Sequence, residues 1–295
     1  MAVAALCLYA GLGVLWTAWR PLKWTDRRPI GALFLASDAH VSAGNPRGWF
    51  NDKELDVRGA AGIEKFGKAM LGYADRSIRI LRETGSQGMI VWDLEGEEFP
   101  HKVTYIGDPR LATRLAPETA NVVDEFFRRF RAAGLSVGVT IRPQQLTFNP
   151  NGEATQEQVW DYERLLIDKI DYARKRWGAT LFYIDSNGGP RWPAEPFRLR
   201  RVAQLRPDVL LIPEHNDILY YGFSAPYGAL RNGDSPTTRA VRSLYPDAFQ
   251  VLAIADAKRS DSEITAAYRN GDVLLFLTWF DSSDTRLLTR LASER

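Results

Sequence analysis

Carboxylates close several apolar stretches of this sequence, at points where buried strands would end. Asp185 lies near the end of the stretch ATLFYIDSNG, and Glu214 near the end of the next one, DVLLIPEH. Because Glu is a poor N-cap residue, helix capping is a weak explanation for Glu214. The ends of neighbouring strands lie about 5 Å apart, which is the separation of the two carboxylates in a retaining glycosidase. The spacing therefore favours glycosidic bond cleavage, with Asp185 as nucleophile and Glu214 as acid/base.

Side chains alternate along a strand, so residues two apart share a face. If Tyr183 faces the interior of a barrel, Asp185 does too. In the same way, Glu214 shares the face of Ile212. An inward carboxylate above apolar side chains is desolvated and close to like charge, and both effects raise a carboxyl pKa. Such a group suits general acid catalysis. If either side chain pointed elsewhere, Asp93 or Glu95 with Asp256 would be the next pair to consider.

Other polar residues and one tryptophan close the same stretches, and we expect them to bind substrate hydroxyls. These predicted substrate-binding residues are Asp38, Asp93, Glu95, Arg142, Gln144, Asn187, His215, Asp256 and Trp279. Arg142 has an equally good alternative, a buried ion pair with Asp93. Aromatic rings near strand ends could stack on sugar faces, although about half would be ordinary core residues. They are Trp92, Tyr105, Trp192, Tyr220, Tyr221, Tyr227 and Trp279.

Eight apolar stretches, separated mostly by helical periods, must position these side chains. They begin at Gly31, Gly88, Ser136, Ala179, Asp208, Ser224 (the weakest), Phe249 and Asp272. Continuous apolar runs are typical of parallel strands that are buried on both faces. Eight strands alternating with helices in this length predict an α/β fold, a (β/α)₈ TIM barrel, whose active site lies at the carboxyl ends of the strands.

The helical stretches carry their apolar residues on one face. The first stripe runs from Phe66 to Leu81, and a second includes Phe127 and opens at Pro117. A third runs from Val159 to Trp177. An open, doubly wound sheet is the rival fold, but it normally has a glycine-rich phosphate loop after its first strand, and none follows here.

The two motifs FYIDSNG and LLIPEH resemble glycoside-hydrolase barrels that carry Asp on the fourth strand and Glu on the fifth, as in the α-amylase-like superfamily. The resemblance implies that Asp185 is the nucleophile and Glu214 the acid/base. Two positions differ: the superfamily has Arg where Tyr183 stands, and His where Ala255 precedes Asp256. WDLEG and VTIRPQ are similar to glycoside-hydrolase-like bacterial barrels, which implies a sugar site but fixes no substrate. We expect the substrate to be a poly- or oligosaccharide.

Two other functions fit the same residues. A metal-dependent hydrolase could use Asp38, His40, Asp93, Glu95, His215 and Asp256 as ligands. The chain has only 3 histidines, however, and barrel metallohydrolases commonly use more. We therefore predict neither a metal nor another cofactor. A non-catalytic carbohydrate-binding barrel would use the same acids and aromatic rings, because a fold does not determine an activity.

Charge and composition limit the remaining classes. The net charge is +2 and no Lys/Arg block stands out, so we expect no nucleic-acid partner. The single cysteine, Cys7, excludes a disulfide framework. Residues 1–19 carry no charged side chain, and this stretch has the length and composition of a membrane span. We predict an apolar N-terminal helix within a membrane anchor or signal segment (1–28), a catalytic barrel (29–295), and a membrane-anchored or secreted protein of the cell envelope.

Overall fold

The structure, a computed structural model, describes residues 22–96, 106–151, 154–187, 195–254, 261–278 and 285–294, without the side chains of residues 38 and 278. Eight parallel strands form one sheet in the order β7-β6-β3-β2-β1-β10-β9-β8. They are β1 (Ile30–Leu33), β2 (Gly88–Val91), β3 (Ser136–Ile141), β6 (Leu181–Ile184), β7 (Leu210–Pro213), β8 (Tyr227–Ala229), β9 (Val251–Ala253) and β10 (Val273–Thr278). All eight predicted stretches therefore contain a strand.

The sheet curls into a nearly closed barrel. The sheet order is sequential apart from its two ends, β7 and β8. Ahead of β8, the amide of Ala225 donates to the carbonyl of Leu211 in β7 at 3.0 Å, which joins these two ends. The fold is therefore the predicted (β/α)₈ barrel rather than an open sheet.

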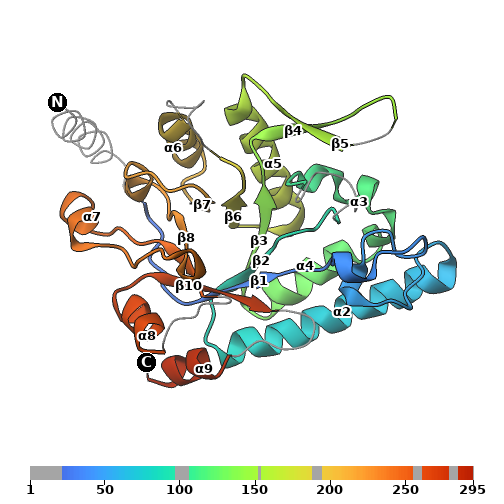
Figure 1. Cartoon of the computed structure of the whole chain (residues 1–295), viewed down its shortest axis with the longest axis horizontal. Coiled ribbons are helices and arrows are strands. Elements are labelled where there is room, and N and C mark those ends of the chain that lie inside the picture. Colours follow the sequence, from blue (N-terminus) through green and yellow to red (C-terminus); the bar gives the residue numbers. More distant parts are fainter. Residues whose placement is uncertain are drawn as a thin grey trace.

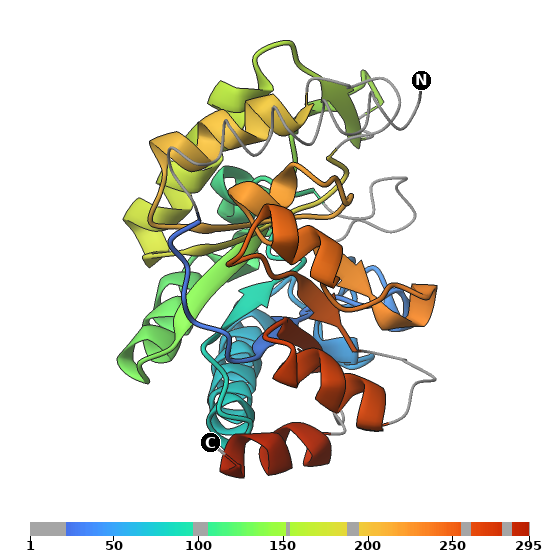
Figure 2. The ribbon, with the colours of Figure 1, turned by 90° about the vertical axis from the view of Figure 1, so that its left-hand side faces the viewer.

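Helices surround the strands, as the two perpendicular views show (Figures 1 and 2). They are α2 (Ala60–Glu83), α3 (Ala112–Leu115), α4 (Val123–Ala132), α5 (Tyr162–Trp177), α6 (Glu195–Leu205), α7 (Arg239–Leu244), α8 (Asp261–Arg269) and α9 (Arg286–Ser293). Between β7 and β8 there is only a 3₁₀ turn (Tyr220–Gly222). Further 3₁₀ turns span Asp38–His40, Trp49–Asn51, Pro109–Leu111, Pro117–Thr119 and Leu230–Asn232.

Two helix starts differ from the sequence prediction. Pro117 opens a separate 3₁₀ turn, in which the Thr119 hydroxyl donates to the carbonyl of Ala116 at 2.7 Å, and α4 begins only at Val123. Val159 precedes α5, which begins after Asp161, whose side chain accepts a hydrogen bond from the amide of Arg164. The residues between β3 and α5 form a hairpin that the sequence analysis did not predict, β4 (Gln144–Phe148) and β5 (Ala154–Gln158).

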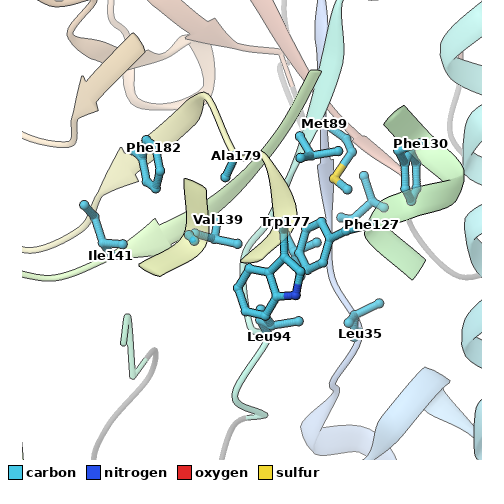
Figure 3. Close-up of a cluster of buried hydrophobic side chains, with 14 of the residues drawn as sticks. Leu35, Met89, Leu94, Phe127, Phe130, Val139, Ile141, Trp177, Ala179 and Phe182 are labelled. Carbon is cyan, nitrogen blue, oxygen red and sulfur yellow. The ribbon is translucent and has the colours of Figure 1, made fainter. Parts of the chain in front are cut away.

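Two apolar cores lie on the two faces of the sheet. The outer core joins strands to helices. Figure 3 shows Met89 and Val139 from the sheet together with Phe127 and Trp177 from α4 and α5. The rings of Phe127 and Trp177 stack with their centroids 4.6 Å apart. The inner core fills the barrel with alternate residues of the strands other than β3, such as Ile30 and Ala32 of β1.

Residues 22–28 pack at the N-terminal end of the barrel. Leu22 and Trp24 contact the inner core, and the indole of Trp24 donates to the side chain of Gln87, which precedes β2. The guanidinium of Arg27 lies 3.6 Å from the ring centroid of Phe249, which precedes β9. Residues 1–21 of the predicted anchor lie outside the described residues. Within the described ranges, no helix has both the length and the hydropathy needed to cross a membrane.

Candidate active site

The alternation of side chains brings two carboxylates to the carboxyl-terminal mouth of the barrel. Tyr183 and Ile212 belong to the inner core, and Asp185 and Glu214 follow them at the next inward positions of β6 and β7. The amide of Glu214 donates to the carbonyl of Ile184 at 3.0 Å, which extends the pairing of the two strands past their ends. The two carboxylates therefore occupy neighbouring positions, with Asp185 4 % exposed.

Asp185 is held by an arginine from the adjacent strand. Arg142 directly follows β3, and its Nε and Nη2 both contact Oδ2 of Asp185. Its Nη1 donates to the side chain of Gln156 in β5 at 2.8 Å. The alternative ion pair between Arg142 and Asp93 was therefore wrong, because Arg142 has the inward parity of Gly138 and Thr140 whereas Asp93 does not.

Three influences act on the Asp185 carboxyl. Burial raises its pKa, the Arg142 guanidinium lowers it, and the Glu214 carboxylate raises it through both charge and a side-chain hydrogen bond, so that the pKa lies at about 6. Asp185 therefore has a basic partner on one side and a second carboxyl group on the other.

Glu214 is fixed by a turn of unusual geometry. Its Oε2 accepts a hydrogen bond from the amide of Ser186 at 2.7 Å, and its side chain is 32 % exposed. Ser186 has a φ of 54°, in the left-handed region that non-glycine residues seldom adopt. The side-chain amide of Gln144 donates to the carbonyl of Ser186 at 3.1 Å. The predicted substrate-binding residue Gln144 thus supports the turn that aims an amide at Glu214.

Asn187 and His215 lie beside this turn. Asn187 is fully buried; its oxygen accepts from the amide of His215 at 3.2 Å, and its nitrogen donates to the hydroxyl of Tyr220 at 3.1 Å. It therefore ties the end of β6 to the segment after β7. The side chain of His215 is 58 % exposed, with Nε2 3.8 Å from Oε2 of Glu214.

An aromatic layer lies below the carboxylates, inside the barrel. The ring centroids of Trp92 and Tyr183 are 4.2 Å apart, those of Phe34 and Trp92 5.7 Å, and those of Tyr183 and Tyr227 5.4 Å. Burial raises the pKa of Tyr227, and the charge of Glu214 raises it further. Phe34 and Tyr183 are not among the predicted aromatic binding residues, although alternation from Ala32 and Asp185 places both inside the barrel.

Asp93 and Glu95 have different surroundings. Asp93 accepts hydrogen bonds from the amides of Leu35 and Ala36 at 2.8 and 2.7 Å, and burial raises its pKa to about 7. Glu95 is 2 % exposed, its carboxyl is influenced by Asp108 and Lys169, and burial raises its pKa to about 8. Neither is brought together with Asp185 and Glu214.

Several predicted site residues lie outside the described residues. They are Asp256 and Trp279, the side chain of Asp38, and the aromatic residues Tyr105 and Trp192. Across the part of the chain that the structure describes, no three His, Cys, Asp or Glu side chains form a group that could hold a metal ion.

Two buried charged residues near the mouth were missed. Lys169 in α5 is 0 % exposed and Glu195 at the start of α6 is 3 % exposed, and burial raises the pKa of Glu195 to about 8. Lys169 lies between Leu166 and Ile170, on the apolar stripe of its helix. A lysine on such a stripe is a signal that sequence reasoning could have used.

No known protein family profile matches the sequence, and no curated protein does either. Solved structures do resemble the fold. An α-L-fucosidase from Paenibacillus thiaminolyticus is similar with a TM-score of 0.52 and 12% identity, covering 94% of this chain and 76% of its own. An α-amylase from Lactobacillus plantarum has a TM-score of 0.51 and 11% identity, covering 91% and 79%. At this identity the likeness shows a shared fold, a (β/α)₈ barrel of the kind these glycosidases have.

Proposed function

We propose that the chain is a glycoside hydrolase-like enzyme that cleaves glycosidic bonds of an oligo- or polysaccharide with retention of configuration. The observation that carries the proposal is the placement of Asp185 and Glu214 side by side at the ends of the paired strands β6 and β7, at the mouth of the barrel. Inverting enzymes need a gap of roughly 6.5–9.5 Å between their carboxyl groups to hold a water molecule, whereas retaining enzymes have them closer together. The named activities of the fucosidase and the amylase support the same class.

The reaction takes two steps. An Asp185 carboxylate oxygen attacks the anomeric carbon while the bond to the leaving oxygen breaks, and the Glu214 carboxyl group gives its proton to that oxygen. Water then attacks the same carbon, Glu214 takes a proton from the water, and the bond to Asp185 breaks. Arg142 stabilises the Asp185 anion before attack and after release, and the ring layer of Trp92 and Tyr183 provides an apolar floor for a sugar.

One observation favours a second candidate, a non-catalytic carbohydrate-binding barrel. Two nitrogen atoms of Arg142 contact the same oxygen of Asp185, and this occupies one of the two oxygens that could attack. In a binding barrel the ion pair would only orient Asp185 toward sugar hydroxyls.

Hydrolysis separates the two candidates. We would screen the wild type against polysaccharides and a panel of aryl glycosides, in parallel with Glu214→Gln and with Glu157→Gln, which removes an exposed carboxylate of the hairpin. Turnover by the wild type and Glu157→Gln, with loss in Glu214→Gln, supports the enzyme. A 2-fluoro glycosyl fluoride of the accepted sugar should then label Asp185. Saccharide binding by all three proteins without turnover would support the binding barrel.

We also propose that the protein belongs to the cell envelope, held by its N-terminal segment or secreted. The uncharged stretch 1–19 supports this placement. Fractionation of cells that express the full chain tests the idea, since a chain recovered only in the soluble cytosol would contradict it.

A further inference from the structure

Lys169 is a fully buried lysine that does not belong to the carboxylate pair. It contacts the main chain around Arg142, the residue that holds Asp185. Its ammonium group donates to the carbonyl of Arg142 at 2.7 Å and to the carbonyl of Gln144 at 2.9 Å. These two carbonyls flank Pro143, where the chain leaves β3 and enters the hairpin. The side chain of one helix thus holds the turn from which Arg142 extends.

Burying this ammonium group is costly, and Asp108 and Glu95 offset only part of that cost. Oδ2 of Asp108 lies 3.7 Å from Nζ, and Asp108 is already engaged by the guanidinium of Arg110 at 2.8 and 2.7 Å. Glu95 faces the same group, and burial raises its pKa to about 8. Desolvation lowers the pKa of Lys169 itself to about 8. A leucine or methionine would fill the stripe of α5 without this penalty, so packing alone does not account for a lysine here.

The backbone of Arg142 is held from its other side by Gly107. The carbonyl of Gly107 accepts a hydrogen bond from the amide of Arg142 at 2.9 Å. Gly107 has a φ of 60°, and a Cβ there would lie 2.8 Å from the backbone nitrogen and the Cγ of Arg142. Only glycine therefore fits, and the peptide groups on both sides of Arg142 have a fixed partner.

A fixed backbone determines where the Arg142 side chain can reach. From this position the guanidinium contacts Asp185 and the side chain of Gln156, which in turn donates to the carbonyl of Ile106 at 3.4 Å. We propose that Lys169 is a positioning residue for the reaction: it holds the main chain of Arg142 so that the guanidinium stays against Asp185. This inference rests on the proposed function, since it gives Arg142 a role in the attack by Asp185.

Kinetics with a double-mutant cycle test the proposal. Lys169→Met keeps most of the side-chain volume and removes the donors, and Lys175→Met is a matched control at an exposed position of the same helix. We expect Lys169→Met to lower kcat/KM roughly 10- to 100-fold, mainly through kcat, because small displacements of catalytic groups have effects of this size. In the Arg142→Met background the same substitution should change kcat/KM less than 3-fold, since the group it acts through is gone. An undiminished effect in that background would overturn the proposal.

A second readout does not depend on turnover. The guanidinium of Arg142 lowers the pKa of Asp185, so moving the guanidinium away raises this pKa. Carbon-13 NMR of the Asp carboxyl groups, with the Asp185 signal assigned through Asp185→Asn, should show the titration at higher pH in Lys169→Met and unchanged in Lys175→Met. A titration that stays in place in a folded Lys169→Met protein overturns the proposal, whatever the enzyme assays show. If no substrate is ever turned over, the proposed function fails while this titration still decides the positioning.

Gly107→Ala is the alternative if Lys169→Met does not fold. The added methyl group displaces Arg142 from the opposite side, and the Asp185 titration should move in the same direction. An unchanged Asp185 titration in Gly107→Ala would also count against a fixed Arg142 main chain.

Discussion

Two pairs of acidic residues follow strand ends in this barrel, and their environments are opposite. Asp185 and Glu214 continue the inward positions of β6 and β7, next to each other, and Asp185 contacts Arg142. Asp93 follows Met89 and Val91, which pack against the helices, and it binds two backbone amides. The same residue types at the same kind of strand end thus meet either the mouth or the protein interior, depending on one step of alternation.

The difference shows that the role of a carboxylate at a strand end depends on the groups that bind its oxygens. Asp93 has its acceptors used by the loop after β1, so it has a structural role in fixing that loop. Asp185 faces a cation and a second carboxyl group that can exchange a proton with a bound molecule. We expect substitution of Asp93 or Glu95 to change stability, and substitution of Asp185 or Glu214 to change activity.

The largest expected effect is that of Asp185→Asn. The amide keeps the shape of the side chain but cannot attack an anomeric carbon, so kcat on aryl glycosides should fall on the order of 10⁴-fold or more, as for other lost nucleophiles. Thermal unfolding should change little, because the amide oxygen still faces Arg142. A steady-state assay and a melting curve measure both.

The matched substitution in the other pair is Asp93→Asn. It replaces one acceptor oxygen by an NH₂ group that faces the amides of Leu35 and Ala36, so the protein should lose about 1–3 kcal/mol of stability. Activity of the folded protein should stay within roughly 10-fold of wild type. A loss of activity as large as that of Asp185→Asn would show that the two pairs are not distinct in role.

Glu214→Gln should have the next largest effect, and one that depends on the substrate. General acid catalysis contributes roughly 10²–10⁴-fold, so the loss should be greatest for leaving groups that need a proton. For activated aryl leaving groups the first step should be nearly unaffected. The measurement is a series of kcat/KM values against leaving-group pKa, which should be steeper in the variant; equal slopes would remove Glu214 from the acid role.

Stability should depend on pH through Glu95, a buried acid that follows β2. The pKa of Glu95 is raised from 4.5 to about 8, so between these values the folded protein binds a proton that the unfolded chain has released. Stability therefore falls as pH rises through this window. Glu95→Gln should flatten urea-unfolding free energies between pH 5 and pH 8 by an amount on the order of a few kcal/mol. A wild-type curve that does not fall over this range would contradict the burial of a neutral Glu95.

Sequence patterns predicted the fold better than the surroundings of the acids. Buried parallel strands give continuous apolar runs, which is why even the short β8 could be found. The same continuity hides which face is inward: in β2 both Ile90 and Val91 are apolar, so the outward parity of Asp93 could not be read. For Asp185, alternation predicted that its side chain shares a face with Tyr183, but not whether that face is the inner one.

Other features depend on contacts between distant segments. The hairpin after β3 has mainly polar residues with a weak alternation, so no apolar pattern predicted it. Arg142 reaches Asp185 from a neighbouring strand, 43 residues away in sequence. The burial of Lys169 depends on carbonyl groups that only the folded turn presents, although its place on an apolar stripe was visible.

The smallest expected effect concerns a hydroxyl group inside the barrel. Thr140 of β3 is 2 % exposed, and among the described residues its Oγ1 has no hydrogen-bond partner. Burying an unpaired hydroxyl costs about 1–3 kcal/mol in proteins, and valine has nearly the same shape without it. Thr140→Val should therefore raise the unfolding free energy by about 1 kcal/mol, seen as a higher urea midpoint without a change in slope.

Ser77→Ala on α2 is the matched substitution in the outer core, since Ser77 is also buried with an unpaired hydroxyl. Because Thr140 lies two residues before Arg142 on the same face, a loss of stability in Thr140→Val alone would indicate that an ordered water joins this hydroxyl to the carboxylate site above it.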